Sequence, residues 1–320
     1  MKHKIKRLLK YPYLNMIDRG GVYDDLTHLK ACYEFLRDSF EYGCLRSHFD
    51  MASNTWGNHY FEISGYAIPT FIEMADFLNK PYNCYLAVEI GNFLLANQKD
   101  DGTLIEPTST KPDCFNISQI MIGWLALYEE TKVERYLNAC IKSADWIIKQ
   151  QNKDGSFNYV YSDHPMNIRI AWALYELFKI IERAEYYNKS ENHHSLYLFA
   201  MEKATEYYKM KTRQSDWLHF LGYEVVGKQK LGINMMLGYN VYYHNYQLTG
   251  QAQMIFAGVG NYDLEHLKKL QFMGKKYYGG LPGSDPLYGG YFPAAIPTWG
   301  VKFLADCLLK NLGANTKYLG

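Results

Sequence analysis

Side chains that can transfer protons or hold sugars recur at several separate points of the chain. Glu62, His164 and Tyr291 are the candidate acid–base groups, because a carboxyl, an imidazole and a phenol can each give or take a proton. Aromatic, amide and charged residues nearby in the sequence are candidate substrate-binding groups: Trp56, His59, Tyr66, Asn116, Gln119, Arg169, Asp285 and Trp299. Together these residue types predict proton-transfer chemistry on a hydroxyl-rich or acidic ligand.

One mechanism that fits is elimination or epimerisation at C5 of a uronate sugar. It requires a cation or amide that neutralises the sugar carboxylate, and a Tyr or His that moves the C5 proton. The candidates for the first task are Arg169, Asn116 and Gln119. The candidates for the second are Tyr66, Tyr291, His59 and His164.

Hydrolysis of a glycosidic bond is the other mechanism, and it requires two carboxylates a few ångströms apart. Among the candidate residues, Glu62 combined with Asp163 or with Asp285 is the pairing that the sequence supports.

Several of these residues have a structural interpretation as well. Glu62 would also suit the cap of a helix that begins near Ser64. Arg169 lies in an apolar run, so it must pair either with a protein anion or with a substrate carboxylate. His59 and His244 fit structural roles better than catalytic ones, and His164 stands before a proline in a turn that solvent could reach. The glycine-rich stretch 283–293 suits a tight turn as well as a ligand cradle.

A repeated turn reveals how the chain is organised. Residues 95–103 (LANQKDDGT) and 148–156 (IKQQNKDGS) align without a gap, and their glycines, Gly102 and Gly155, are 53 residues apart. Residues 271–280 form a looser copy, and 213–217 and 40–43 are degenerate ones. This spacing holds two helices and their loops, so the repeat unit is a helical hairpin.

Apolar periodicity agrees with the hairpin repeat, and no segment shows the sustained alternation of a strand. Helices are predicted at 26–39, 63–78, 81–97, 116–131, 134–151, 166–184, 193–212, 232–248, 260–272 and 294–311. Each hairpin alone leaves an apolar face exposed, and stacking of neighbours buries it. We therefore predict an all-α fold, an α/α toroid of five to six helical hairpins, as a single domain over 1–320 with an N-terminal extension at 1–22.

The repeated turns also predict where a site would lie. They lead from outer helices into inner ones, so the N-termini of the inner helices should meet at one rim. That rim gathers free backbone N–H groups and positive helix ends, which favour anionic or polyhydroxyl ligands. The candidate residues lie at or near these N-termini.

The composition of the chain limits the kinds of partner that can be expected. Lys and Arg total 34 against 33 Asp and Glu, a net charge of +1 that argues against a general nucleic-acid binder. The basic N-terminus, with its lysines at 2, 4, 6 and 10, suits at most weak contact with a membrane surface. No signal peptide and no span long enough for a bilayer is evident. With 30 Tyr, 16 Phe and 6 Trp, the chain is rich in the rings that line sugar-binding grooves.

The six cysteines stand singly, without paired spacing, as expected for a protein of the reducing cytoplasm. No Cys, His and Asp set has the spacing of a zinc site, so no metal and no cofactor are predicted.

Five stretches resemble a family of toroidal proteins labelled as carrying prenyltransferase/squalene-oxidase-type repeats. The run 60–71 (YFEISGYAIPTF) is similar to that family's E-T-T-G-Y-x-I-P-T segment, and 115–124 to its F-D-T-G-Q-x-x-x-G-W. Residues 144–156, 167–174 and 283–303 match three further segments, so the resemblance extends over about 35–311. One position departs, because the family's aspartate in F-D-T-G-Q is Asn116 here.

Many members of that family are assigned to bacterial exopolysaccharide or lipopolysaccharide gene clusters. The resemblance implies that Glu62, Gln119, Arg169 and Trp299 are cleft residues. Terpenoid cyclisation or prenyl transfer is disfavoured, since those reactions need clustered aspartates or zinc and the adjacent aspartates here are only 24–25 and 100–101. The sequence therefore predicts a lyase, C5-epimerase or hydrolase of surface-polysaccharide metabolism that acts on an acidic saccharide. A non-catalytic glycan-binding or assembly factor is the alternative.

Overall fold

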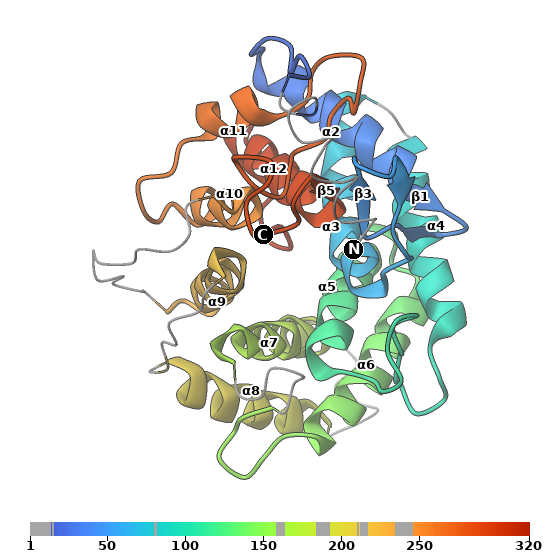
Figure 1. Ribbon diagram of the computed structural model, residues 1–320. Helices are drawn as coiled ribbons and strands as arrows, with labels where there is room; N and C mark the ends of the chain where they lie inside the picture. The colour runs from blue at the N-terminus through green and yellow to red at the C-terminus, as the bar shows by residue number, and fades with distance from the viewer. Residues whose placement is uncertain are drawn as a thin grey trace.

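The computed structural model describes residues 14, 16–79, 82–157, 164–183, 193–209, 211, 217–233 and 246–320. In these ranges the chain forms two concentric layers of helices (Figure 1). The inner helices are α3 (Phe61–Leu78), α5 (Cys114–Thr131), α7 (Ile168–Arg183), α9 (Leu218–Lys230), α10 (Leu248–Ala257) and α12 (Thr298–Asn311). The outer helices are α2 (Asp25–Ser39), α4 (Tyr82–Asn97), α6 (Glu134–Lys149), α8 (His193–Lys209) and α11 (Leu264–Leu270).

The inner helices close into a ring. Each one packs against the next, α12 returns to α3, and α2 covers α12 from outside. The predicted all-α toroid is therefore confirmed, including the closure of the ring by the first predicted helix. The described residues hold six inner and five outer helices, in agreement with the predicted five to six hairpins. The connection from α9 to α10 includes residues 234–245, which lie outside the described residues.

The repeated turns dock one outer helix onto the next. Gln98 Nε2, after α4, donates to a backbone carbonyl oxygen of α6 at 2.9 Å, and Gln151 Nε2, after α6, donates to one of α8 at 2.8 Å. Gly102 (φ 87°) and Gly155 (φ 96°) then lie directly against the backbone of the same two helices. The two turns repeat one geometry, so they lie on the same rim as predicted.

The looser copy of the turn, at residues 271–280, closes the outer layer of helices in the same way. Gln271, after α11, has its Nε2 2.9 Å from the Gly279 carbonyl oxygen and 3.5 Å from that of His28 in α2. Gly279 (φ 82°) lies against the carbonyl oxygen of Ala31 in α2. One docking motif therefore joins α4 to α6, α6 to α8, and α11 to α2.

Replacing Gly102 by Ala should lower the free energy of unfolding by more than about 1 kcal/mol, because its φ is positive and the new methyl would overlap the Lys142 carbonyl oxygen. Gly258 is the matched control. Its φ is 68°, yet no described atom lies within 4 Å of an added Cβ. Chemical denaturation of both Ala variants separates docking from backbone strain, and equal losses would contradict the docking role.

Most of the inner helix predicted at 232–248 lies outside the described residues, at 234–245. The structure has two inner helices on either side that the sequence analysis did not predict: α9 ends at Lys230, and α10 begins at Leu248. Both are buried almost all round, so they lack the polar face that makes periodicity visible. Gly222 of α9 allows close approach to α10, and Gly227 of α9 allows close approach to α7.

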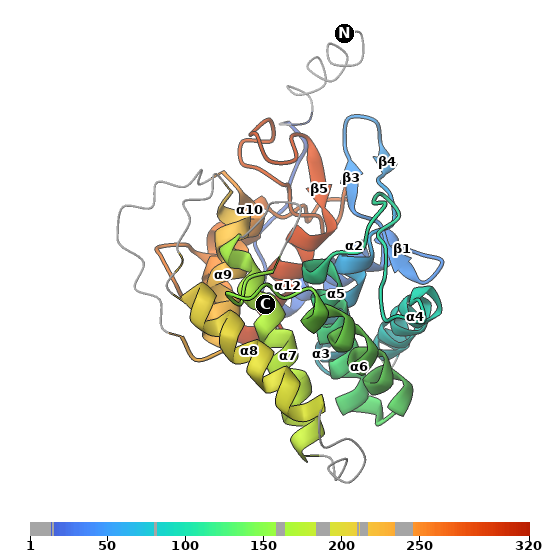
Figure 2. The same ribbon diagram turned by 90° about the horizontal axis from the view of Figure 1, so that it is seen from below.

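Short strands lie at the rim of the ring where the inner helices begin. In the described residues they form a two-stranded pair, β1 (Phe40–Glu41) with β2 (Cys44–Leu45), and an antiparallel sheet in the order β4-β3-β5. That sheet joins β3 (His48–Asp50) and β4 (Thr55–Trp56), before α3, to β5 (Ala295–Pro297), before α12 (Figure 2). The predicted helix at 294–311 accordingly begins at Thr298, because the preceding residues pair with β3.

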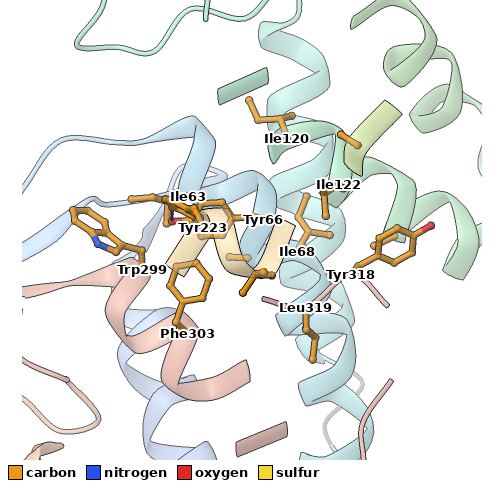
Figure 3. Close-up of a cluster of buried hydrophobic side chains, with 14 of the residues drawn as sticks. Ile63, Tyr66, Ile68, Ile120, Ile122, Tyr223, Trp299, Phe303, Tyr318 and Leu319 are labelled. Atoms are coloured by element: carbon orange, nitrogen blue, oxygen red, sulfur yellow. Dashed lines mark hydrogen bonds between the residues drawn. The ribbon is translucent and has the colours of Figure 1, made fainter. Parts of the chain in front are cut away.

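The opposite end of the ring is filled by the segment after α12. Leu319 is fully buried, and it belongs with Tyr318 to the hydrophobic cluster that also holds Ile68 and Ile122 (Figure 3). Gly320 N donates to Asp306 Oδ2 at 2.8 Å. The ring is therefore open at the strand-bearing rim and closed at the other end. No helix in the described ranges has the length and apolar character needed to cross a membrane.

Candidate functional site

A cavity of about 630 Å³ lies at the open rim, where inner helices begin. Five of the six inner helices reach it with residues in or next to their first turns, and rim loops complete the wall. The helical contributors are Glu62, Ile63 and Tyr66 of α3, Phe115 of α5, Met166 before α7, His219, Phe220 and Tyr223 of α9, and Trp299 of α12. The loop contributors are Ser47, His48, Gly57, Asn58, Tyr60, Thr108, Trp217, Gly290, Tyr291 and Phe292. The predicted convergence of inner-helix N-termini is confirmed.

Glu62 is the carboxylate of this wall, and hydroxyl groups surround it. Tyr223 OH donates to Glu62 Oε1 at 3.2 Å, and Tyr223 OH also lies 3.3 Å from Tyr66 OH. Tyr66 stacks on Phe303 of α12, so the group is held from three inner helices (Figure 3). Burial, and after it the nearby Glu106, raise the pKa of Glu62 to about 8. Glu62 therefore carries a proton at neutral pH.

Glu106, in the loop between α4 and α5, caps the helix on which Glu62 stands. Its Oε2 accepts from Phe61 N at 2.8 Å and its Oε1 from Glu62 N at 2.7 Å. Tyr60, the N-cap residue of α3, provides no side-chain cap. Burial raises the pKa of Glu106 to about 7, against the lowering effect of the two backbone hydrogen bonds.

Aromatic rings form the wall of the cavity beside Glu62. Trp299 Nε1 donates to Tyr291 OH at 2.7 Å, which fixes both rings. The ring of His219 stacks parallel to Trp299 at 6.3 Å between centroids, and Trp217 lies 5.5 Å from Tyr291. Such a surface matches the apolar face of a sugar ring, while the polar edges of the side chains reach its hydroxyls.

His219 is held in the wall by a hydrogen bond between its Nδ1 and Gln253 Oε1, 2.7 Å apart. Burial, together with the nearby charge of Arg169, lowers the pKa of His219 to about 3. The imidazole is therefore neutral and is not an acid of the site.

Arg169 and Gln119 lie beneath the cavity and do not line it. Arg169 Nε donates to Gln119 Oε1 at 2.6 Å, and its Nη2 donates to Gly320 O at 2.8 Å. The guanidinium is fully buried between the rings of Trp172 and Tyr223, each centred 4.9 Å away. The Tyr223 ring therefore stands between Arg169 and the site.

Asn116 and His164 lie one layer behind the wall. Asn116 Nδ2 is 3.5 Å from Glu106 Oε1, so its contact is with the capping carboxylate. Met166 N donates to His164 Nδ1 at 3.2 Å, and the imidazole packs edge-on against Phe220. His164 therefore supports residues of the cavity wall, whereas Asn116 contacts a residue behind the wall.

Three other candidates lie away from the cavity. Trp56 packs on Phe35 at 5.2 Å between ring centroids. His59 has its Nε2 3.3 Å from a carboxylate oxygen of Glu41. Asp285 pairs loosely with Arg19, 3.9 Å away, so the predicted pairing with Glu62 is not formed. Asp163 and His244 lie outside the described residues.

Of the predicted site residues, Glu62, Tyr66, Tyr291 and Trp299 are brought together. The sequence interpretation missed His219, Tyr223 and Glu106. A signal existed for the first two, because they follow the degenerate turn copy at 213–217 and so stand where the repeat places the start of an inner helix. No sequence signal pointed to Glu106, since it lies in a loop and reaches α3 only through the fold. In the described ranges no three His, Cys, Asp or Glu side chains form a group suited to a metal ion.

No protein-family model and no curated protein sequence matches the chain. Solved structures do share its fold. A protein described as a novel α-amylase from Clostridium perfringens is 10% identical with a TM-score of 0.60, covering 89% of this chain and 98% of that one. An unsaturated glucuronyl hydrolase specific for heparin is also 10% identical with a TM-score of 0.60, covering 89% and 94%.

An unsaturated glucuronyl hydrolase from Streptococcus agalactiae is 12% identical, with a TM-score of 0.54, covering 91% of this chain and 93% of that one. At these identities the likeness shows the fold, a helical toroid.

Proposed function

We propose that this protein is a carbohydrate-active enzyme that hydrolyses a glycosidic bond with Glu62 as the proton donor. The observation that carries the proposal is the buried carboxyl of Glu62 in the wall of an aromatic cavity, where burial raises its pKa to about 8. A carboxylic acid that keeps its proton near neutral pH is suited to protonate a leaving oxygen. The solved structures with the same fold are described as an α-amylase and an unsaturated glucuronyl hydrolase, and these descriptions support a hydrolase by analogy.

A single carboxyl can serve both halves of such a reaction. Glu62 gives its proton to the glycosidic oxygen as the bond to the anomeric carbon breaks. The resulting carboxylate then takes a proton from the water that adds to that carbon, which restores the acid. Tyr223 OH, which donates to Glu62 Oε1, keeps the carboxyl oriented between the two steps.

We further propose that the sugar unit beside Glu62 is uncharged, in place of the acidic saccharide expected from the sequence. The described residues that line the cavity include no Lys or Arg, and the guanidinium of Arg169 is engaged behind Tyr223 by Gln119 and Gly320. A uronate carboxylate here would lie unpaired beside Glu62, at a cost of more than about 1.4 kcal/mol, or tenfold in affinity.

The test is a panel of matched oligosaccharides with neutral or uronate end units, including fragments of bacterial exopolysaccharides, since that setting is predicted by the resemblance in 60–71. Calorimetry should show neutral ligands binding at least about tenfold more tightly, and reducing-end assays should show their hydrolysis. Preferential binding of uronates would contradict the neutral subsite. Absence of binding across the panel would contradict the carbohydrate function.

A non-catalytic glycan-binding factor is the second candidate. The observation that favours it is that Glu62 is the only carboxylate among the described residues of the cavity wall, whereas most glycosidases use two. Tight binding of a saccharide that the protein never cleaves would select this alternative.

A further inference from the structure

Glu106 and Glu62 form an unusual arrangement at the start of α3. Glu62 is in the first turn of that helix, where free N–H groups and the positive helix end normally favour a carboxylate. Glu106 instead accepts from Phe61 N at 2.8 Å and Glu62 N at 2.7 Å, and it is only 6% exposed. A carboxylate from another loop therefore takes the hydrogen bonds and the dipole that would otherwise stabilise charge on Glu62.

We propose that Glu106 is a positioning residue for the catalytic acid: by capping α3 it fixes the backbone of Glu62 and cancels the positive helix end, so that Glu62 keeps its proton. This inference rests on the proposed function of Glu62, and it adds a residue that does not line the cavity. Glu106 is the anion of the pair because it has two backbone N–H donors, whereas Glu62 Oε1 has one neutral phenol.

Burial is the largest cause of the raised pKa of Glu62, and Glu106 is the largest among the charged groups around it. Tyr223 of α9 and Tyr66 of α3 face it with hydroxyls, and Arg169 of α7 favours the carboxylate from below. Asp113, which caps α5, opposes ionisation of Glu62, but more weakly than Glu106. Glu106 is therefore the charged neighbour that most strongly keeps the proton on Glu62.

The decisive variant is Glu106→Gln, which keeps an acceptor for one N–H but removes the charge. The pH at which Glu62 titrates should fall by about one unit or more, because a like charge has been lost. The alkaline limb of kcat/KM should move down with it. Asp113→Asn is the matched control. It also removes a half-buried capping carboxylate, one that accepts from Phe115 N and Asn116 N, and should move the limb by less than half as much.

A direct measurement makes the test independent of activity. Carboxyl ¹³C NMR of glutamate-labelled wild-type protein, assigned by loss of the signal in Glu62→Gln, should show Glu106 ionising at lower pH than Glu62. This order can be read even if Glu106→Gln does not fold. Glu62 ionising first, or a titration of Glu62 unchanged in folded Glu106→Gln, would reduce Glu106 to a structural cap and overturn the inference. Loss of activity alone would bear only on the proposed function.

Discussion

Replacing Glu62 by Gln should abolish turnover while leaving saccharide binding within a few-fold of the wild type. Gln has nearly the same shape and still accepts from Tyr223, but it has no proton to donate. The loss of general acid catalysis should reduce kcat by about 10²–10⁴. Steady-state kinetics together with calorimetry on the same ligand separate the two effects.

The pH profile provides a second measure of the same group. Glu62 acts in its protonated form, and its pKa is raised to about 8 by burial and by Glu106. Activity of the wild type should therefore be retained through neutral pH and fall as pH rises through about 8. Any residual activity of Glu62→Gln should lack that limb.

Glu73→Gln is the matched control for this prediction. Burial raises the pKa of Glu73 to about 7, but the residue lies at a separate small cavity beside Asn315 and Tyr318. The same substitution there should leave kcat and its pH dependence unchanged. Full activity in Glu62→Gln, or an equal loss in Glu73→Gln, would show that Glu62 is not the acid.

Replacing Arg169 by Ala should produce the largest loss of stability of any substitution considered, at least about 3 kcal/mol. The change empties the space between the rings of Trp172 and Tyr223, and it leaves Gln119 Oε1 and Gly320 O without their donor in the buried interior. Denaturant unfolding should show this as a lowered midpoint. Saccharide affinity, measured well below the transition, should change only a few-fold.

Arg135→Ala is the control for the loss of a guanidinium over an aromatic ring. Arg135 lies over Tyr136 at 5.3 Å and donates to Asn92 Oδ1 at 2.8 Å, but it is exposed on the outer layer. Its loss should cost less than about 1 kcal/mol. If Arg169→Ala kept its stability and instead lost uronate binding, Arg169 would contact the ligand, and the uronate mechanism would regain its support.

The fold was predictable from the sequence because its signals are local. The turns at Gly102 and Gly155 share one pattern because each must dock on the next outer helix in the same way. Outer helices such as α6 carry one apolar face and show clear periodicity. Helix α9 has no such face, since the ring buries it on nearly every side, and so it was missed.

The rim on which the site lies could also be predicted, since every inner helix begins there. The sequence could not predict which side chains enter the cavity. Glu62 and Arg169 both stand in the first turn of an inner helix, yet one lines the cavity and the other lies beneath it. The difference depends on how each helix is rotated about its axis, which packing against its neighbours decides.

The sequence by itself determined the helical hairpins, their closure into a ring and the presence of Glu62 at the working rim. Only the tertiary structure decided what surrounds Glu62. Tyr223 and Glu106 are 161 and 44 residues away from it along the chain, and they reach it through hydrogen bonds that no local pattern encodes. The chemistry of Glu62 depends on those contacts, because burial and a neighbouring charge, not residue type, determine whether a carboxyl keeps its proton.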